Sequence, residues 1–158
     1  MLKALFLTTF VATGAFSTAA FADGDAAAGE DTFKRCKSCH GIVNGDETIV
    51  RGGRTGPNLY GMIGMTAGTV EGFRYGDDIV AAGAAGLVWD EENLAEYVAD
   101  PTAFIRTFLG DDSARAKMTF KLRSGGEDVA AYLASLAPMM EMEEETEEGE
   151  EAEEGESS

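Results

Sequence analysis

The chain has 158 residues, with 29 acidic and 12 basic side chains and a formal net charge of −17. This length suits one domain of ordinary size. The acidic balance argues against a nucleic-acid-binding protein, because phosphate backbones are bound by basic surfaces. We therefore expect protein partners that recognise local patches of charge.

The first 22 residues predict a secretory signal peptide. Lys3 is followed by an apolar run over 4–12, and small residues lead to Ala22, after which we expect cleavage. The apolar run is shorter than the ~20 residues that span a bilayer, so we expect no stable membrane insertion. Retention of this segment as an uncleaved anchor is the alternative.

The opposite end predicts a disordered acidic tail over residues 139–158. It contains eleven Glu, no Lys or Arg and no aromatic residue, so it cannot bury enough apolar surface to offset the entropy of ordering. The segment between the two ends, 23–138, is predicted to form the single folded domain. It holds eleven basic and eighteen acidic side chains, a formal charge of −7.

One short motif carries the chemistry. The run Cys36-Lys37-Ser38-Cys39-His40 is a C-x-x-C-H sequence. Two thiols one helical turn apart can add to the two vinyl groups of a haem, and the next residue can direct its imidazole at the iron. Because His40 is the only histidine, no site that needs a second one can form around it. The motif predicts one covalent haem c attached at Cys36 and Cys39, with His40 as an axial ligand.

A redox-active dithiol and a structural disulfide are the alternatives for Cys36 and Cys39. A thioredoxin-type dithiol lies in a βαβ unit, whereas no strand signal precedes this motif. Residues 25–35 instead predict a helix that the motif closes, with Gly29 and Phe33 on one face. We therefore favour haem attachment.

The residues alone leave the second axial ligand open. Without another histidine it can be a thioether sulfur, a lysine or an open position. Met62, Met65 and Met118 lie within the predicted domain. Met118 is the best candidate, because it lies beside Phe120 in an irregular segment, 114–123, although a methionine is more often core filler.

Helix signals are clear in the second half of the domain. Asp90 is a candidate N-cap for a helix that contains Leu94, and Pro101 ends that helix or opens the next one. Residues 124–127, Ser-Gly-Gly-Glu, have the spacing of a capping box before a terminal helix. Glycines are frequent from 41 to 72, which predicts loops around a bound group.

The order of these motifs resembles the class I cytochromes c, the family of the small mitochondrial carrier and its bacterial relatives of the cytochrome c2 kind. The resemblance covers nearly all of residues 23–136. It implies an all-α cytochrome c fold of about four to five helices, with glycine-rich loops around one covalently bound haem. The matching segments are Gly24-Asp25 with Gly29 and Phe33, the haem motif, Thr55 to Gly61, Gly72 to Tyr75, Trp89, Leu94 to Pro101, Lys117 to Phe120, and Ala131 to Leu133.

The resemblance also implies roles for residues near the iron. Met118 would be the second axial ligand. The Pro57 carbonyl would accept the free N–H of His40 and so fix the tautomer of the imidazole. Tyr97 would donate a hydrogen bond toward the Met118 sulfur.

Three further aromatic residues would surround the rest of the haem. Tyr75 and Trp89 would hydrogen-bond the inner propionate, with plain aromatic packing as the alternative, and Phe120 would shield the exposed edge. The chain departs from the family pattern at two positions. Met65 stands where the mitochondrial type has an arginine, and Ala116 stands where many relatives have a threonine, so we expect the propionates to lack these two contacts.

The function implied by the resemblance is electron transfer and not enzymatic catalysis. We expect a monomeric periplasmic carrier that shuttles one electron between membrane redox complexes, such as a quinol–cytochrome c reductase and an oxidase or photosynthetic reaction centre. We expect it to dock through a basic rim, with scattered solvated charges as the alternative. The rim residues are Lys34, Lys37, Arg54, Arg115, Lys117, Lys121 and Arg123.

Two functions of other classes stay open. A haem enzyme or gas sensor needs an exchangeable position on the iron, which carbon monoxide binding to the ferrous protein would reveal. An immobile module of a larger complex would be anchored by the leader or the tail, which fractionation would reveal. A four-helix cytochrome is disfavoured, because its haem motif lies near the C-terminus.

Overall fold

The structure, a computed structural model, describes residues 24–136. These residues form five helices and one two-stranded antiparallel hairpin, which confirms the all-α fold class. The predicted signal peptide, 1–22, and the predicted tail, 139–158, lie outside the described residues. In chain order the elements are α1 (Ala26–Phe33), β1 (Ile42–Asn44), β2 (Glu47–Val50), α2 (Asp77–Ala84), α3 (Glu91–Ala99), α4 (Pro101–Leu109) and α5 (Gly126–Ser135).

The first and last helices cross in direct contact. A Cβ atom built on Gly29 of α1 would lie 1.9 Å from the carbonyl oxygen of Asp128 in α5, so only glycine fits at the crossing. Next to it, the rings of Phe33 and Tyr132 pack with their centroids 5.6 Å apart. The Asp128 carboxylate also accepts the backbone N–H of Asp25, the N-cap of α1, at 2.9 Å. These contacts join the two ends of the domain.

Helices α3 and α4 begin as predicted. Asp90 caps α3, and Asn93 returns a side-chain bond to the Asp90 backbone, which completes a capping box. Pro101 occupies the first turn of α4, and Asp100 caps this helix by accepting the N–H of Ala103 at 3.2 Å. Proline suits this position because the N–H it lacks has no partner in the first turn of a helix.

The predicted capping box at the start of α5 is wrong. The N-cap is Gly125, which has a left-handed backbone (φ 78°) and makes no side-chain bond to the helix. The reason is close packing: a Cβ atom on Gly126 would lie 3.0 Å from the Ala95 carbonyl oxygen of α3. A two-glycine entry lets α5 approach α3, so the tertiary contact overrides the local capping signal from Ser124.

Two other expectations need correction. The glycine-rich stretch was predicted as loops throughout, but it contains the β1–β2 hairpin, which turns at Gly45 (φ 55°) and buries Ile42 completely. The first helix ends at Phe33 instead of Arg35, and residues 34–39 form consecutive turns. The haem motif therefore begins within these turns, just after the helix ends.

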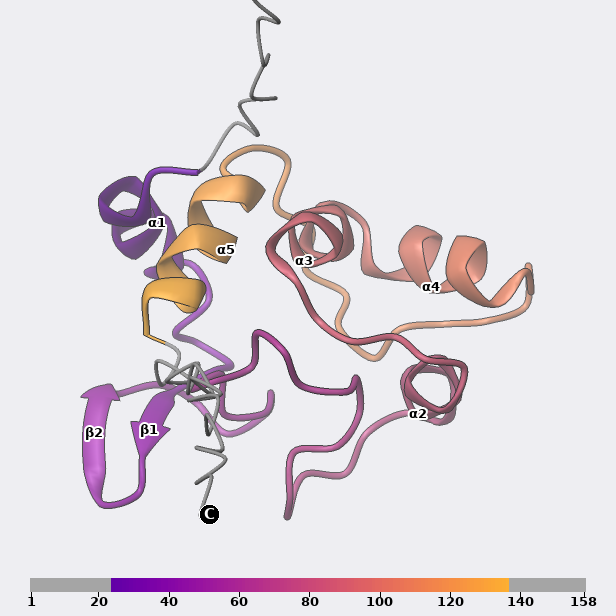
Figure 1. Ribbon diagram of the computed structural model, residues 1–158, viewed down its shortest axis with the longest axis horizontal. Helices are drawn as coiled ribbons and strands as arrows, with labels where there is room; N and C mark the ends of the chain where they lie inside the picture. The colour runs from indigo at the N-terminus through magenta and orange to yellow at the C-terminus, as the bar shows by residue number, and fades with distance from the viewer. Residues whose placement is uncertain (1–23, 137–158) are drawn as a thin grey trace, which may run out of the picture.

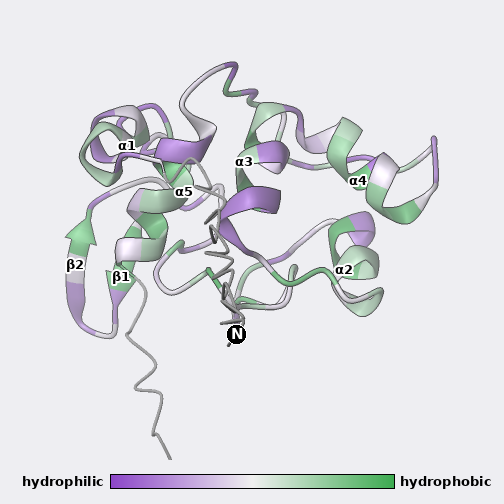
Figure 2. Ribbon diagram, turned by 45° about the horizontal axis from the view of Figure 1, so that its top comes forward, coloured by the Kyte–Doolittle hydropathy of each residue, from purple (hydrophilic) through white to green (hydrophobic). Residues whose placement is uncertain are grey.

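Figure 1 shows α1 crossing α5 on one side, α3 beside α5, and α4 and α2 on the other side. The long segment from β2 to α2 runs across the bottom of this view. Figure 2 shows that α2, α4 and α5 are hydrophobic on only part of their circumference, as expected for helices that bury one face. No helix within residues 24–136 has the length and apolar character needed to cross a bilayer.

The glycine at the α1–α5 crossing gives a first prediction. Gly29→Ala forces the helices apart, because the added carbon meets backbone atoms of Asp128 that have no alternative rotamer. We expect a loss of about 3 kcal/mol in the free energy of unfolding, at the upper end of overpacking effects. Denaturant titration of the holoprotein measures it. Glu30→Ala, an exposed change at the next position, should alter stability by less than about 0.5 kcal/mol.

Candidate functional site

A large cavity of about 670 Å³ lies between the long loop, α3, α5 and the segment around Met118. Its walls are mainly apolar and aromatic. None of the described residues that line it is Asp or Glu. The lining residues that matter most below are Cys39, His40, Arg54, Gly56, Pro57, Met62, Met65, Arg74, Tyr75, Trp89, Tyr97, Lys117, Met118, Phe120, Val129 and Leu133.

His40 is held at the cavity wall in one defined state. Its Nδ1 lies 2.9 Å from the Pro57 carbonyl oxygen. Because a carbonyl can only accept, Nδ1 carries the proton, and Nε2 keeps a free lone pair. Burial lowers the pKa of the imidazole, which the Pro57 carbonyl opposes. A neutral imidazole with Nε2 unprotonated is the form that binds a metal ion.

The glycine before Pro57 sets the distance between the loop and the imidazole. A Cβ atom on Gly56 would lie 2.3 Å from Cε1 of His40. The Gly56 N–H donates to the Cys39 carbonyl at 2.9 Å, and the Gly53 N–H donates to the Lys37 carbonyl, also at 2.9 Å. The loop therefore lies directly against the motif, and its backbone supports the ring.

The two thiols of the motif differ in environment. Cys36 packs against the core, and burial raises its pKa. Cys39 is exposed on the cavity wall, where the hydroxyls of Thr55 and then Ser38 lower its pKa. A redox dithiol of the thioredoxin type needs a stabilised thiolate at its N-terminal cysteine. Burial raises the pKa of Cys36, the N-terminal cysteine here, and so disfavours its thiolate, which argues against a redox dithiol.

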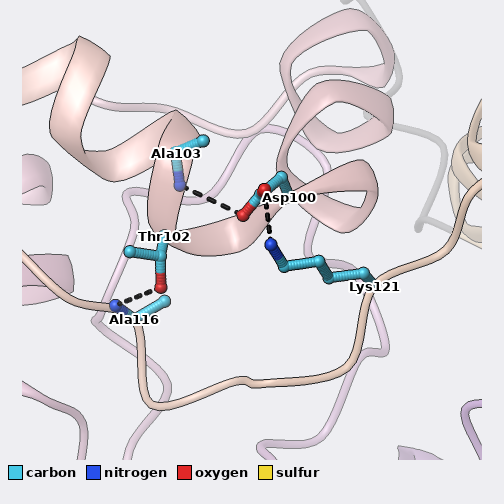
Figure 3. A network of polar contacts seen from close by, with 5 residues as sticks. All are labelled: Asp100, Thr102, Ala103, Ala116 and Lys121. Atoms are coloured by element: carbon cyan, nitrogen blue, oxygen red, sulfur yellow. Dashed lines mark hydrogen bonds and ion pairs between the residues drawn. The ribbon is translucent and has the colours of Figure 1, made fainter.

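The segment that carries Met118 is anchored on both sides of the methionine by the α3–α4 junction (Figure 3). Before it, the Ala116 N–H donates to the Thr102 hydroxyl at 3.3 Å. After it, the Lys121 ammonium contacts the Asp100 carboxylate at 2.6 Å. The same carboxylate caps α4, so one acidic side chain connects the helix start with the methionine segment.

A third anchor reaches the long loop. The Lys117 ammonium donates to the carbonyls of Arg74 and Tyr75, at 3.0 and 2.8 Å. Lys117 therefore joins the methionine segment to the loop across the cavity opening. Phe120 lines the cavity with 39% of its surface exposed, and the guanidinium carbon of Arg35 lies 5.5 Å from its ring centroid.

Aromatic residues fill the wall between α3 and α4. Trp89 and Tyr97 meet edge to face with centroids 4.9 Å apart, and Phe104 packs on both. Burial raises the pKa of Tyr97 to about 12. Its hydroxyl therefore stays protonated and available as a hydrogen-bond donor.

The cavity brings together most of the residues that the sequence suggested. Cys39, His40, Pro57, Tyr75, Trp89, Tyr97, Met118 and Phe120 all line it, while Cys36 packs beside it. Arg74, Asp100 and Thr102 were missed as site residues. Arg74 lies within a matched segment and Asp100 precedes a helix-starting proline, but neither signal points to a cavity.

Three of the side chains predicted for the basic rim make contacts within the domain. Lys34 pairs with Asp31 and Lys121 with Asp100, and Lys117 is bound to backbone carbonyls. Arg54 and Lys117 are exposed and line the cavity opening, together with Arg74.

Within residues 24–136, no group of three or more His, Cys, Asp or Glu side chains is placed to hold a metal ion. A site made only of side chains is therefore not found there. The single imidazole and the cavity beside it suit a metal carried by an organic ring.

Comparison with known proteins identifies relatives of this chain. No family model matches it. Cytochrome c-551 of Roseobacter denitrificans is 64% identical over 118 residues, 74% of this chain and 84% of that protein. Cytochrome c2 of Rhodobacter capsulatus is 56% identical over 127 residues, 80% and 92% of the two chains. The solved structure of the Rhodobacter cytochrome c2 superposes with a TM-score of 0.70 at 58% identity, covering 71% of this chain and 97% of that one.

The chain therefore belongs to the class I cytochromes c, the small single-haem electron-transfer proteins. Its relatives within that class are the bacterial cytochromes c2, c-550 and c-551. Like them it carries one covalently attached haem c and transfers electrons instead of converting a substrate.

The residues present fit this group. The cavity volume falls within the roughly 300–1,000 Å³ typical of small-molecule and cofactor sites. Its apolar and aromatic walls suit a flat porphyrin, and Nε2 of His40 has a free lone pair beside it. Cys36 and Cys39 lie directly before this histidine, as covalent attachment requires.

Gly56 gives a second prediction. Gly56→Ala places a methyl carbon 2.3 Å from Cε1 of His40, far inside van der Waals contact, and must displace either the ring or the Pro57 loop. We expect the yield of haem-containing protein to fall severalfold when the variant is expressed with a maturation system. Haem content per polypeptide, from absorbance after denaturation in pyridine, measures it. Thr48→Ala, an exposed change in β2, should keep the parental haem content.

Proposed function

We propose that the protein is a soluble periplasmic electron carrier in which Cys36 and Cys39 attach the haem and His40 and Met118 are the axial ligands. Its electrons would pass between membrane redox complexes, of the quinol–cytochrome c reductase and oxidase or photosynthetic reaction-centre kinds. The domain would be residues 23–138, released from the leader 1–22 and followed by the tail 139–158.

The observation that carries the proposal is the convergence of His40 and Met118 on one cavity. They are far apart in the chain and both line it. The oriented His40 supplies one unprotonated nitrogen. The haem, when bound, supplies a one-electron Fe(III)/Fe(II) couple.

Three methionines line the cavity, and the structure favours Met118 among them. Met62 is 7% exposed and belongs to the hydrophobic core. Met65 lies in a backbone pairing with Trp89, whose N–H donates to its carbonyl at 2.9 Å. Met118 instead lies between the anchors at Ala116 and Lys121. This arrangement holds the backbone on both sides and leaves the thioether to reach into the cavity.

A histidine and methionine pair suits electron transfer by two physical effects. The soft thioether favours the ferrous state and raises the reduction potential. Two protein ligands also leave no position for a substrate. The protonated Tyr97 hydroxyl is a donor available to the Met118 sulfur, Tyr75 and Trp89 would donate to a propionate, and Phe120 would cover the exposed edge.

Docking would use the basic residues near the cavity opening. Arg54 and Lys117 are exposed at this opening, and an acidic surface of a partner would meet them. The other predicted rim residues, Lys34, Lys37, Arg115, Lys121 and Arg123, are all exposed and would extend this surface. We propose that the protein acts as a monomer, as a mobile carrier requires.

The ligand assignment gives a third prediction. Met118→Leu removes the thioether and opens one side of the iron. We expect the weak far-red sulfur-to-iron band of the ferric protein to disappear, and the ferrous protein to bind carbon monoxide. Visible spectroscopy measures both.

Met62→Leu and Met65→Leu are matched controls with the same chemical change in the same cavity. Both should keep the band and resist carbon monoxide. If the band survives in the Met118 variant and is lost in either control, Met118 is not the axial ligand. Carbon monoxide binding by the parent protein would favour a gas-binding function.

The leader gives a fourth prediction. When the full chain is expressed in a bacterium, the coloured protein should appear in the periplasmic fraction without detergent and begin at Asp23, because a short leader ending in small residues is cleaved. Mass spectrometry of the purified protein measures the first residue. Recovery only with membranes, with Lys3 still present, would show an anchored module instead.

A further inference from the structure

The cavity opening carries an unexpected concentration of positive charge. Arg54, Arg74 and Lys117 line the cavity and are exposed, which places them at its mouth, and Arg35 lies over Phe120 at the same opening. We call these four residues the cationic mouth. The protein as a whole has a net charge of −17, so this local excess runs against the overall balance.

Within residues 24–136, no recorded ion pair involves these four side chains. The recorded ion pairs are Lys34 with Asp31 and Lys121 with Asp100. Lys117 is bound by two carbonyl oxygens, which accept hydrogen bonds but carry no net charge. The two propionates of the haem can balance at most two of the four charges. At least two of the four charges are therefore left without a partner among the recorded ion pairs and the propionates.

The C-terminal segment has the matching charge. Residues 139–158 hold eleven Glu and no basic residue. The described chain ends one residue after α5, whose last residue is Ser135, and Leu133 of this helix lines the buried wall of the cavity.

The length is sufficient as well. The 22 residues after Leu136 can extend to at most roughly 70 Å, and a flexible chain of that length has an end-to-end distance of roughly 26 Å. The carboxylates can therefore reach the opening without any change in the domain.

We propose that the acidic C-terminal segment binds the cationic mouth within the same molecule and competes there with acidic electron-transfer partners. The inference rests on the proposed function, because it assumes that electron-transfer partners dock on this surface. Because the segment is covalently linked, its effective concentration at the mouth is high, of order millimolar. The contact is electrostatic between exposed groups, so salt in the Debye-screening range should release it. Ionic strength would then set how much of the mouth is open.

The first experiment locates the segment. Three ferrous holoproteins are compared by two-dimensional ¹H–¹⁵N NMR: the full mature chain, a chain ending at Pro138, and a full-length chain with all eleven tail Glu changed to Gln. At about 10 mM salt, signals of Arg35, Arg54, Arg74 and Lys117 should differ between the first protein and the other two. At about 0.5 M salt the differences should vanish.

The second experiment measures competition with an anion. Hexacyanoferrate(III), a trianion, oxidises the ferrous protein by one electron and becomes hexacyanoferrate(II). At low salt, removal of residues 139–158 should raise this rate at least about tenfold, and the ratio should fall toward one at high salt.

A matched pair of variants separates binding at the mouth from the general effect of net charge. Arg74→Gln should reduce the ratio of truncated to full-length rates severalfold. Arg51→Gln makes the same charge change at an exposed residue that does not line the cavity, and should leave the ratio unchanged.

Two results overturn the inference: NMR differences spread evenly over the surface or absent at low salt, and equal reductions of the rate ratio in the two arginine variants. Either result in a protein with a normal haem spectrum leaves the proposed function intact. A colourless mature protein would instead overturn the proposed function.

Discussion

The site depends on one hydrogen bond, between Nδ1 of His40 and the Pro57 carbonyl. It decides which nitrogen of the imidazole is protonated, and therefore which nitrogen can bind iron. The bond exists because Gly56 lets the loop lie against the ring, closer than any side chain would allow. Gly56 thus acts on the proposed metal ligand through the backbone, because it leaves the space that the His40 ring occupies.

The methionine segment is held by a different principle. Its position comes from polar contacts to two parts of the fold. Thr102 and Asp100 lie at the α3–α4 junction, and the carbonyls that receive Lys117 belong to the long loop. The exposed ion pair alone contributes little. Together the contacts hold both flanks of Met118, so the thioether would be positioned by a frame that has no covalent bond to the haem. His40, by contrast, follows directly after the attachment cysteines.

Short sequence patterns predicted the helix starts that depend on a few neighbouring residues. The cap at Asp90 and the proline at the start of α4 depend on a few neighbouring residues, and they are found as expected. The α5 capping box failed because the contact between Gly126 and α3 is not visible in sequence. The hairpin was missed because strands of three and four residues within a glycine-rich stretch give almost no periodic signal.

For the site, the motif around His40 and the family resemblance indicated eight residues that line the cavity, because these residues lie in recognisable segments. They did not indicate Arg74, Asp100 or Thr102, whose importance comes only from what lies opposite them in space. The pairing of Lys121 with Asp100 likewise could not be predicted from the charge pattern, because the two residues are 21 positions apart in the chain.

The crossing of α1 and α5 has a consequence for how the protein is made. Cys36 and Cys39, the proposed attachment sites, follow closely after α1, yet α1 gains its packing partner only when α5 has been synthesised. Contacts between residues so distant in the chain form late and slowly. Until the last helix is available, the two cysteines would therefore stay accessible, which would leave time for haem attachment before the domain packs around them.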